Sequence, residues 1–279
     1  MSASVDVAQV LDPRVSDAEA QFRRLKQREA WRRRILPCVG ILIGIGVWAA
    51  LVYVFNVPPF IAPSPFTVVA TFVTKFVVLM SNLWPTVVEA VGGFVVGNVF
   101  AITLAIAFVH RKAISETFFA LVVLINSIPV VAKAPILVLL LGNGFAPKIA
   151  IAAVISFFPT LVNMVRGLES VDPQAMELMR VLSASNREVF IKLRLYNSLP
   201  YLFSALRISA SSSVVGAIVG EWIGSNYGIG ALIIQATYAF DSALLYAAVF
   251  LGSAFSVLFF MAISLVERVV VRWQPPSAA

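Results

Sequence analysis

Long apolar stretches dominate the pattern of residues along the chain. No Asp, Glu, Lys or Arg occurs between Ile35 and Thr74, and further runs poor in charge follow at intervals. A helix needs about 20 consecutive apolar residues to cross a bilayer. The pattern therefore predicts six membrane-spanning helices. Their expected ranges are 36–56, 85–109, 115–141, 146–166, 204–224 and 243–266. Pro129 and Pro135 fall within the third range, so we expect a kinked or broken helix there.

Composition supports a membrane protein. The 279 residues are 60% hydrophobic and 13% charged, whereas soluble domains are about 45–50% apolar and about 25% charged. Lipid must therefore solvate much of the surface, and the expected fold class is all-α integral membrane. The net charge of +7 is carried by basic residues between the apolar runs, where topology signals lie, which argues against a nucleic-acid partner. The single cysteine, Cys38, excludes an intramolecular disulfide.

The positions of the basic residues predict which side of the membrane each loop occupies. Apart from Lys75, Lys133 and Lys148, the Lys and Arg residues lie in the N-terminal tail, after the second span, after the fourth span and in the C-terminal tail. With six spans these segments share one side, and the positive-inside rule places it in the cytoplasm. We therefore expect both termini to be cytoplasmic. The expected organisation is a tail over 1–34, a transmembrane domain over 35–272 and a short tail over 273–279.

The segment after the fourth span, called loop 169–203 below, is predicted to form two short helices. Asp172 followed by Pro173 is typical of a helix N-cap with proline at the first helical position. The next residues form one apolar face at helical spacing. These are Ala175, Met176, Leu178, Met179 and Leu182.

A turn and a second helix are expected next. Small residues at 183–185 permit a turn, and Ser185 with Glu188 predicts a capping box. The second helix is expected to end near Asn197 and Ser198, before Pro200. Two amphipathic helices need a partner to bury their apolar faces. The residues alone leave open whether the partner is the chain's own membrane helices or a separate cytoplasmic protein.

Loop 169–203 resembles the "EAA" loop of binding-protein-dependent ABC importer permeases, in the branch that handles nitrate, sulfonates and taurine. The positions that match that branch are Glu177, Leu178, Leu182, Ala184, Ser185, Val189, Phe190, Lys192, Leu195, Leu199 and Pro200. The chain departs from it at Met179, at Ser183 in place of glycine and at Tyr196 in place of the first proline. Further segments are similar to that branch in the same order, at 61–72, 127–144, 157–168, 218–233 and 265–273.

The resemblance implies a type I ABC importer permease fold, whose cytoplasmic coupling loop docks into a separate ATPase. Its implied partners are a second copy of this chain, two cytoplasmic ATPase subunits and an extracytoplasmic solute-binding protein, in a bacterial inner membrane. The coupling residues would be Glu177, Leu178, Leu182, Ser183, Ala184, Ser185, Val189, Phe190, Lys192 and Pro200. The branch also carries pyrimidine vitamin precursors and riboflavin, and the stretches at 218–224 and 243–250 resemble those members slightly more.

The chain itself shows no sign of an energy-converting or catalytic site. It contains no G-x-x-x-x-G-K-[ST] sequence to cradle a nucleotide phosphate, so energy must come from another polypeptide or from an ion gradient. No cofactor or metal ligand set is expected, and no catalytic nucleophile–base set is found. The alternatives are an ion-driven secondary transporter, which predicts mid-membrane carboxylates, and a membrane enzyme.

Two ionisable residues in or near the spans are candidates for the translocation path, Lys133 and Glu221. Charged groups inside a membrane are costly and are often functional. Lys133 either lines the path, where it attracts an anionic or carbonyl-bearing substrate, or reaches the interface or pairs with a glutamate. Glu221 precedes a glycine-rich stretch and is either an interfacial cap or a contact for the binding protein.

Overall fold

The computed structural model describes residues 13–272, and within this range every regular element is a helix. The predicted all-α fold is therefore confirmed. The chain divides at Pro65 into two units. The first contains one long helix, α1 (Pro13–Val54), which begins within the basic tail. Its charge-free part, Ile35–Val54, is 20 residues long. At 1.5 Å per residue this part covers about 30 Å, the thickness of a bilayer's hydrocarbon core.

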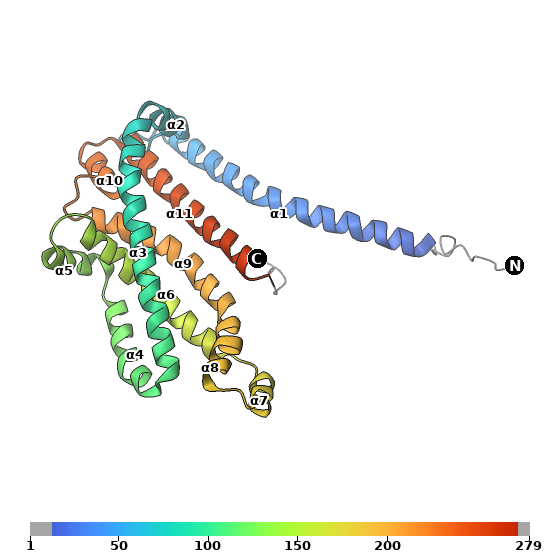
Figure 1. The fold of residues 1–279 in the computed structure, drawn as a ribbon. Helices are drawn as coiled ribbons and strands as arrows, with labels where there is room; N and C mark the ends of the chain where they lie inside the picture. Colours follow the sequence, from blue (N-terminus) through green and yellow to red (C-terminus); the bar gives the residue numbers. More distant parts are fainter. Residues whose placement is uncertain (1–12, 273–279) are drawn as a thin grey trace. The chain divides into compact units, whose positions relative to one another are not determined.

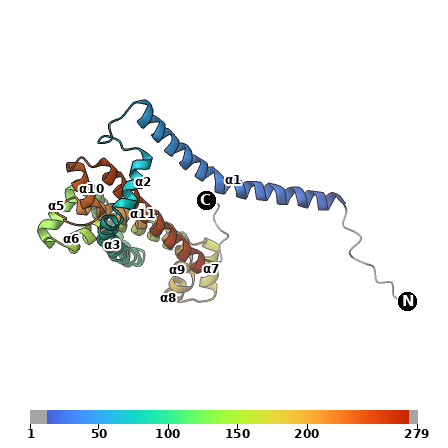
Figure 2. The same ribbon diagram turned by 90° about the horizontal axis from the view of Figure 1, so that it is seen from above.

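The second unit is a bundle of helices (Figures 1 and 2). In chain order they are α2 (Pro65–Thr74), α3 (Phe76–His110), α4 (Lys112–Ser127), α5 (Val130–Leu141), α6 (Phe145–Glu169), α7 (Pro173–Val181), α8 (Asn186–Val189), the π-helical segment η2 (Phe190–Arg194), α9 (Leu195–Glu221), α10 (Ile229–Tyr238) and α11 (Ser242–Val270). Helices α3, α6 and α9 pack against one another at its centre, and α11 packs on α9.

Four stretches of the described second unit are long and apolar enough to cross a membrane. They are α3, α6, the helix that runs without a break from Asn186 to Glu221, and α11. Helices α4 and α5 pass the same test only as a pair, because they have just 16 and 12 residues, and they meet at an angle of 101°. The break falls at Ile128 and Pro129, between the two helices. The interruption predicted for the third span is therefore confirmed.

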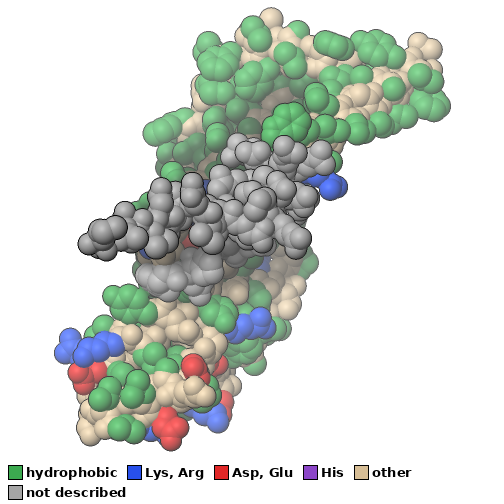
Figure 3. All heavy atoms as spheres, turned by 90° about the vertical axis from the view of Figure 1, so that its right-hand side faces the viewer, with side chains coloured by type: hydrophobic (Ala, Val, Ile, Leu, Met, Phe, Trp, Pro, Cys, Tyr) green, Lys and Arg blue, Asp and Glu red, His purple; other side chains and the backbone are tan. Residues whose placement is uncertain are grey.

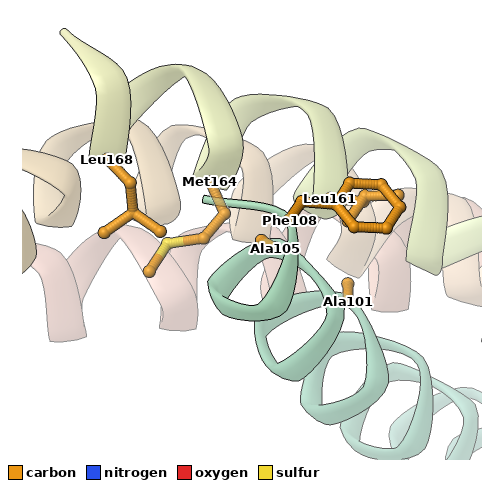
Figure 4. Close-up of a cluster of buried hydrophobic side chains, with 6 residues drawn as sticks. All are labelled: Ala101, Ala105, Phe108, Leu161, Met164 and Leu168. Atoms are coloured by element: carbon orange, nitrogen blue, oxygen red, sulfur yellow. The ribbon is translucent and has the colours of Figure 1, made fainter. Parts of the chain in front are cut away.

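The bent pair connects opposite ends of the bundle. Near one end, Oε1 of Glu89 on α3 lies 3.5 Å from Nζ of Lys148 on α6. Near the other, residues 101–108 of α3 cluster with residues 161–168 of α6 (Figure 4). Because α3 and α6 run in the same direction, the chain between them must return from one end to the other. Helices α4 and α5 thus form one broken crossing, which with α1 and the four stretches above gives the six predicted spans. Below, "the loop end" means the end of the bundle at loop 169–203, and "the far end" means the opposite end of the bundle, at α10.

Small residues let the central helices approach closely. A Cβ atom on Gly93 of α3 would collide with the Cβ of Ala152 of α6. One on Gly97 would collide with the carbonyl oxygen of Ala153. In lipid, where hydrophobic attraction between helices is absent, such close packing holds helices together. The sequence at these two positions therefore fixes the spacing of α3 and α6.

Buried hydroxyl and amide groups tie the same three helices together. The hydroxyl of Thr160 on α6 donates to Oδ1 of Asn98 on α3 at 2.5 Å. It also lies 2.9 Å from the hydroxyl of Ser209 on α9, which donates to the carbonyl of Ser156 at 2.7 Å. All four side chains are buried. Because each polar group finds a protein partner, none is left unsatisfied where water is absent.

The prediction for the end of the second loop helix is wrong. Instead of ending near Asn197, the helix continues through η2 and α9, with Pro200 inside α9. Proline removes one intrahelical hydrogen bond. Tertiary packing outweighs this loss, because Ser198 is buried so close to α6 that a Cβ on Gly167 would lie 2.9 Å from its Cα. Neighbouring helices allow prolines inside membrane helices in this way.

Candidate functional site

The first helix of loop 169–203, α7, begins as the sequence predicts. The side chain of Asp172 accepts a hydrogen bond of 3.0 Å from the backbone N–H two residues later, and Pro173 occupies the start of the helix. The prediction of a single apolar face on this helix is wrong, because positions 176 and 178 lie on opposite sides of it. Ala175, Met176 and Met179 are partly buried, whereas Leu178 and Leu182 are 58% and 66% exposed. The second unit therefore leaves the side at Leu178 and Leu182 uncovered. The charged side chains near it gather at the lower end of the space-filling view (Figure 3).

The turn after α7 requires an unusual backbone conformation. Ser183 has a φ of 52°, in the left-handed region. Its N–H donates to the carbonyl of Arg180, and the N–H of Ala184 donates to that of Met179, both at 2.9 Å. A non-glycine residue in this region carries a steric cost of roughly 1–2 kcal/mol. This explains why the loops that this segment resembles have glycine here, since glycine adopts the conformation without that cost.

The predicted capping box of the second helix is present. The hydroxyl of Ser185 accepts from the N–H of Glu188 at 3.3 Å, and the carboxylate of Glu188 accepts from the N–H of Ser185 at 3.0 Å. Lys192, one turn later, lies 3.0 Å from the same carboxylate. The hydrogen bond from the Ser185 backbone, followed by those from Lys192 and the Ser185 side chain, lowers the pKa of Glu188 to about 2. The cap is therefore fully charged at neutral pH.

Side-chain contacts attach the loop to the ends of α3 and α6. Phe190 packs against the apolar cluster between these helices, and its ring meets that of His110 edge to face at 4.7 Å between centroids. The amide of Asn197 donates to the carbonyls of Gly167 at 3.1 Å and Ser170 at 3.0 Å. Carbonyls at a helix end lack partners within the helix, so this amide caps α6. The loop is therefore a packed part of the bundle end.

The predicted loop residues fall into two groups. The exposed ones are Glu177, Leu178, Leu182, Ser183, Ser185 and Lys192. The partly buried ones are Ala184, Val189, Phe190 and Pro200. The first group forms a surface, and the second holds that surface on the bundle. Their role in contact with an ATPase stays a prediction.

Glu221 lies buried at the far end, where it holds the start of α10. Its carboxylate accepts from the hydroxyl of Thr86 and from the N–H of Gly230, both at 2.6 Å, and its exposed fraction is 1%. A Cβ on Gly228 would collide with this carboxylate, and one on Gly230 would lie 2.9 Å from it. The glycines after Glu221 therefore leave room for its side chain. The carboxylate of Glu221 therefore caps α10, because it accepts from an N–H at the start of that helix.

The burial of Lys148 was not predicted from the sequence. Its Nζ lies 3.5 Å from Oε1 of Glu89 and donates to the hydroxyl of Ser225 at 2.7 Å, and the residue is 4% exposed. A signal was available, because Glu89 and Lys148 are lone charges of opposite sign in two predicted spans. Lone charges within a membrane pair with one another.

Lys133, the other candidate path residue, is partly buried on α5. Among the residues that the structure describes, it forms no ion pair with a carboxylate and no bond to Glu221. The structure therefore does not bring these two candidates into contact. Whether Lys133 lines the path stays a prediction.

A largely apolar cavity of about 360 Å³ lies between α3, α4 and α6. The rings of Phe100, Phe157 and Phe158 line it, and the amide of Asn126 contributes a polar group. Ligand pockets have volumes of about 300–1,000 Å³ and combine apolar walls with a few polar groups. Phenyl rings stack on or meet edge to face with other flat rings, so the lining suits an aromatic ligand. No pattern in the sequence had indicated this cavity.

Apolar crossings tied by buried polar contacts, with a structured loop packed at one end, place the chain among the polytopic membrane permeases. It belongs to the family described as binding-protein-dependent transport system inner membrane component, which it matches over residues 97–275. Both the family and the fold expected from the resemblance are confirmed. The chain is thus a multi-pass permease subunit of the ABC importer class.

Named relatives are similar over most of their length. The chain is 31% identical to the formylaminopyrimidine transport permease protein ThiX of Halalkalibacterium halodurans, over 77% of this chain and 87% of the relative. It is 30% identical to the riboflavin transport system permease protein RibX of Chloroflexus aurantiacus, over 90% and 94%. Its fold is similar to a chain of the MetNI methionine ABC transporter solved in inward-facing conformations. The TM-score is 0.62 at 20% identity, over 71% of this chain and 98% of that one.

Proposed function

We propose that the chain is the permease of an ATP-driven importer built from two copies of this chain, two cytoplasmic ATPase subunits and a solute-binding protein. The observation that carries this proposal is the apolar face of α7 at Leu178 and Leu182, exposed on a loop that is fixed to the bundle. An exposed apolar face on a short helix is suited to a groove on a partner protein. A partner that moves α7 would also move the ends of α3 and α6, because Phe190 and Asn197 join the loop to them.

The proposed orientation places the loop and both termini in the cytoplasm. The distribution of Lys and Arg supports this orientation, because these residues are concentrated in the two terminal tails and in the connections between helices at the loop end. An ATPase that uses cytoplasmic ATP then has access to α7. A membrane-impermeant maleimide that labels Leu182→Cys in intact spheroplasts would contradict this orientation.

The proposed cargo is a small flat heterocycle, such as a pyrimidine vitamin precursor or a flavin. The names of two relatives, for formylaminopyrimidine and riboflavin transport, support this class. The cavity lined by Phe100, Phe157 and Phe158 supports it independently, because its rings suit an aromatic ligand.

A cross-linking experiment tests the contact with the ATPase. Cys38 is replaced by serine, and a photoreactive maleimide is attached to Leu182→Cys in the membranes of cells that natively produce this chain. We expect an adduct with the mass of permease plus ATPase. The matched control is Tyr238→Cys, which is 81% exposed but lies at the far end. No adduct at position 182, or equal adducts at both positions, would contradict the proposal.

The energy source is tested by transport into proteoliposomes that contain the complete complex. The ATP-driven importer requires ATP, is inhibited by vanadate and is insensitive to an uncoupler. The ion-driven alternative predicts uptake that an uncoupler abolishes and that vanadate leaves unchanged.

A further inference from the structure

A second cavity, of about 350 Å³, lies between the end of α3 and loop 169–203. Its basic lining groups come from three elements: His110 from α3, Arg180 from α7 and Arg194 from η2. Of the described residues that line it, none is acidic. Within residues 13–272, neither arginine forms an ion pair with a carboxylate. The positive charge at this cavity is therefore uncompensated.

Helix α7 separates this cavity from the surface proposed to meet the ATPase. Met176 and Arg180, one turn apart, line the cavity. Leu178 and Leu182, also one turn apart, are exposed. With 3.6 residues per turn, the two pairs lie on opposite sides of the helix. An occupant of the cavity and a protein docked on the leucines would thus contact α7 at the same time without overlap.

His110 is held in place by two contacts. Its Nδ1–H donates to the carbonyl of Ile106 at 2.8 Å, and its ring packs edge to face on Phe190. This bond leaves Nε2 as the ring nitrogen available to another partner. The side-chain amide of Asn186 adds a neutral donor to the lining. The polar side chains that line the cavity are therefore mainly donors, and they come from both helices of the loop and from the end of α3.

We propose that this cavity binds a phosphate group. Guanidinium groups present forked donors that match pairs of phosphate oxygens. The neighbouring Arg111 adds positive charge at the same helix end, where basic residues attract anionic headgroups, whereas Lys112 is paired with Glu116 at 3.7 Å. The phosphate comes either from an anionic phospholipid of the adjacent leaflet or from a soluble phosphate compound. Once bound, it joins α3 to α7 and η2 and fixes the position of the loop.

The test uses the purified full chain in nanodiscs, without its partners, so its outcome is independent of the proposed importer function. Retention of phosphatidylglycerol against phosphatidylcholine is measured by native mass spectrometry, and binding of inorganic phosphate by calorimetry. The variant is Arg180→Gln with Arg194→Gln. The control is Arg187→Gln, an exposed arginine of the same loop that does not line the cavity. We expect each lost cavity arginine to weaken binding about fivefold and the pair about thirtyfold. The control should change it less than twofold.

The two measurements separate the sources of phosphate. Retained phosphatidylglycerol without measurable binding of inorganic phosphate identifies a lipid headgroup, and the reverse identifies a soluble compound. Equal retention of both lipids together with no phosphate binding overturns the proposal. The proposal is also overturned if the control loses as much binding as the double variant. The overall positive charge of the loop, and not the cavity, would then attract the phosphate. If the double variant elutes as aggregate, the single variants, each expected to show about a fivefold loss, decide the question.

Discussion

Replacement of Glu221 separates two roles that its position allows, a cap for α10 and a contact along the translocation path. In Glu221→Ala, the N–H of Gly230 loses its acceptor, whereas the hydroxyl of Thr86 keeps the carbonyl of Asn82 at 3.3 Å. Gly230 is buried, and an unsatisfied buried donor costs about 1–3 kcal/mol. The free energy of unfolding should therefore fall by about 1–3 kcal/mol. In Glu221→Gln one carboxamide oxygen remains, while the NH₂ group faces one of the two donors, so we expect about half that loss.

The assay is thermal unfolding of the purified full chain in detergent, followed by tryptophan fluorescence. Each kcal/mol corresponds to about 2–4 °C in Tm for a chain of roughly this size. A double-mutant cycle with Thr86→Val supplies the control. In the Glu221→Ala background, Thr86→Val should cost less than it does alone, because its bond to Glu221 is already gone. Unchanged Tm in Glu221→Ala, combined with lost uptake, would refute the capping argument and favour the path role.

Three further predictions concern other parts of the bundle. Ser183→Gly should stabilise loop 169–203 by about 1 kcal/mol, because the left-handed conformation costs glycine little; unchanged hydrogen exchange in the loop would contradict this. The 2.6 Å bond from Lys75 holds the pKa of Asp241 below its usual 3.8. The stability that this pair contributes is therefore present above pH 3.8 and is lost as the pH falls through the lowered pKa, and Asp241→Asn should remove that pH dependence of Tm. Gly97→Val should prevent folding, because its side chain collides with α6; Gly44→Val on α1, where a Cβ meets nothing within 4 Å, should express normally.

Local signals in the sequence predicted part of the fold well. The apolar runs and Pro129 predicted six crossings with a broken third one, because length and proline act locally. Asp172 and the pair Ser185 and Glu188 predicted helix starts correctly for the same reason. In each case the partner atoms lie within a few residues along the chain.

Features that depend on distant segments escaped the sequence analysis. Pro200 looked like a helix end, but Ser198 packs on Gly167 of α6 and the helix continues. The short helix α10 was not predicted as a separate element, because side chains of α3 and α9 cap its start. The first cavity brings together residues from three elements and the second from four, a proximity that no local pattern indicates.

The helix from Asn186 to Glu221 has a mechanical consequence. Its 36 residues measure about 54 Å at 1.5 Å per residue, and it begins in the loop and ends at the carboxylate that caps α10. About two thirds of the way along it, Ser209 contacts Thr160 and Ser156 of α6. The helix also packs closely on α6 at Ser198 and at Gly216, on either side of Ser209. A push on the loop is therefore transmitted to Glu221 and the start of α10 by α9 and α6 moving together as one packed pair.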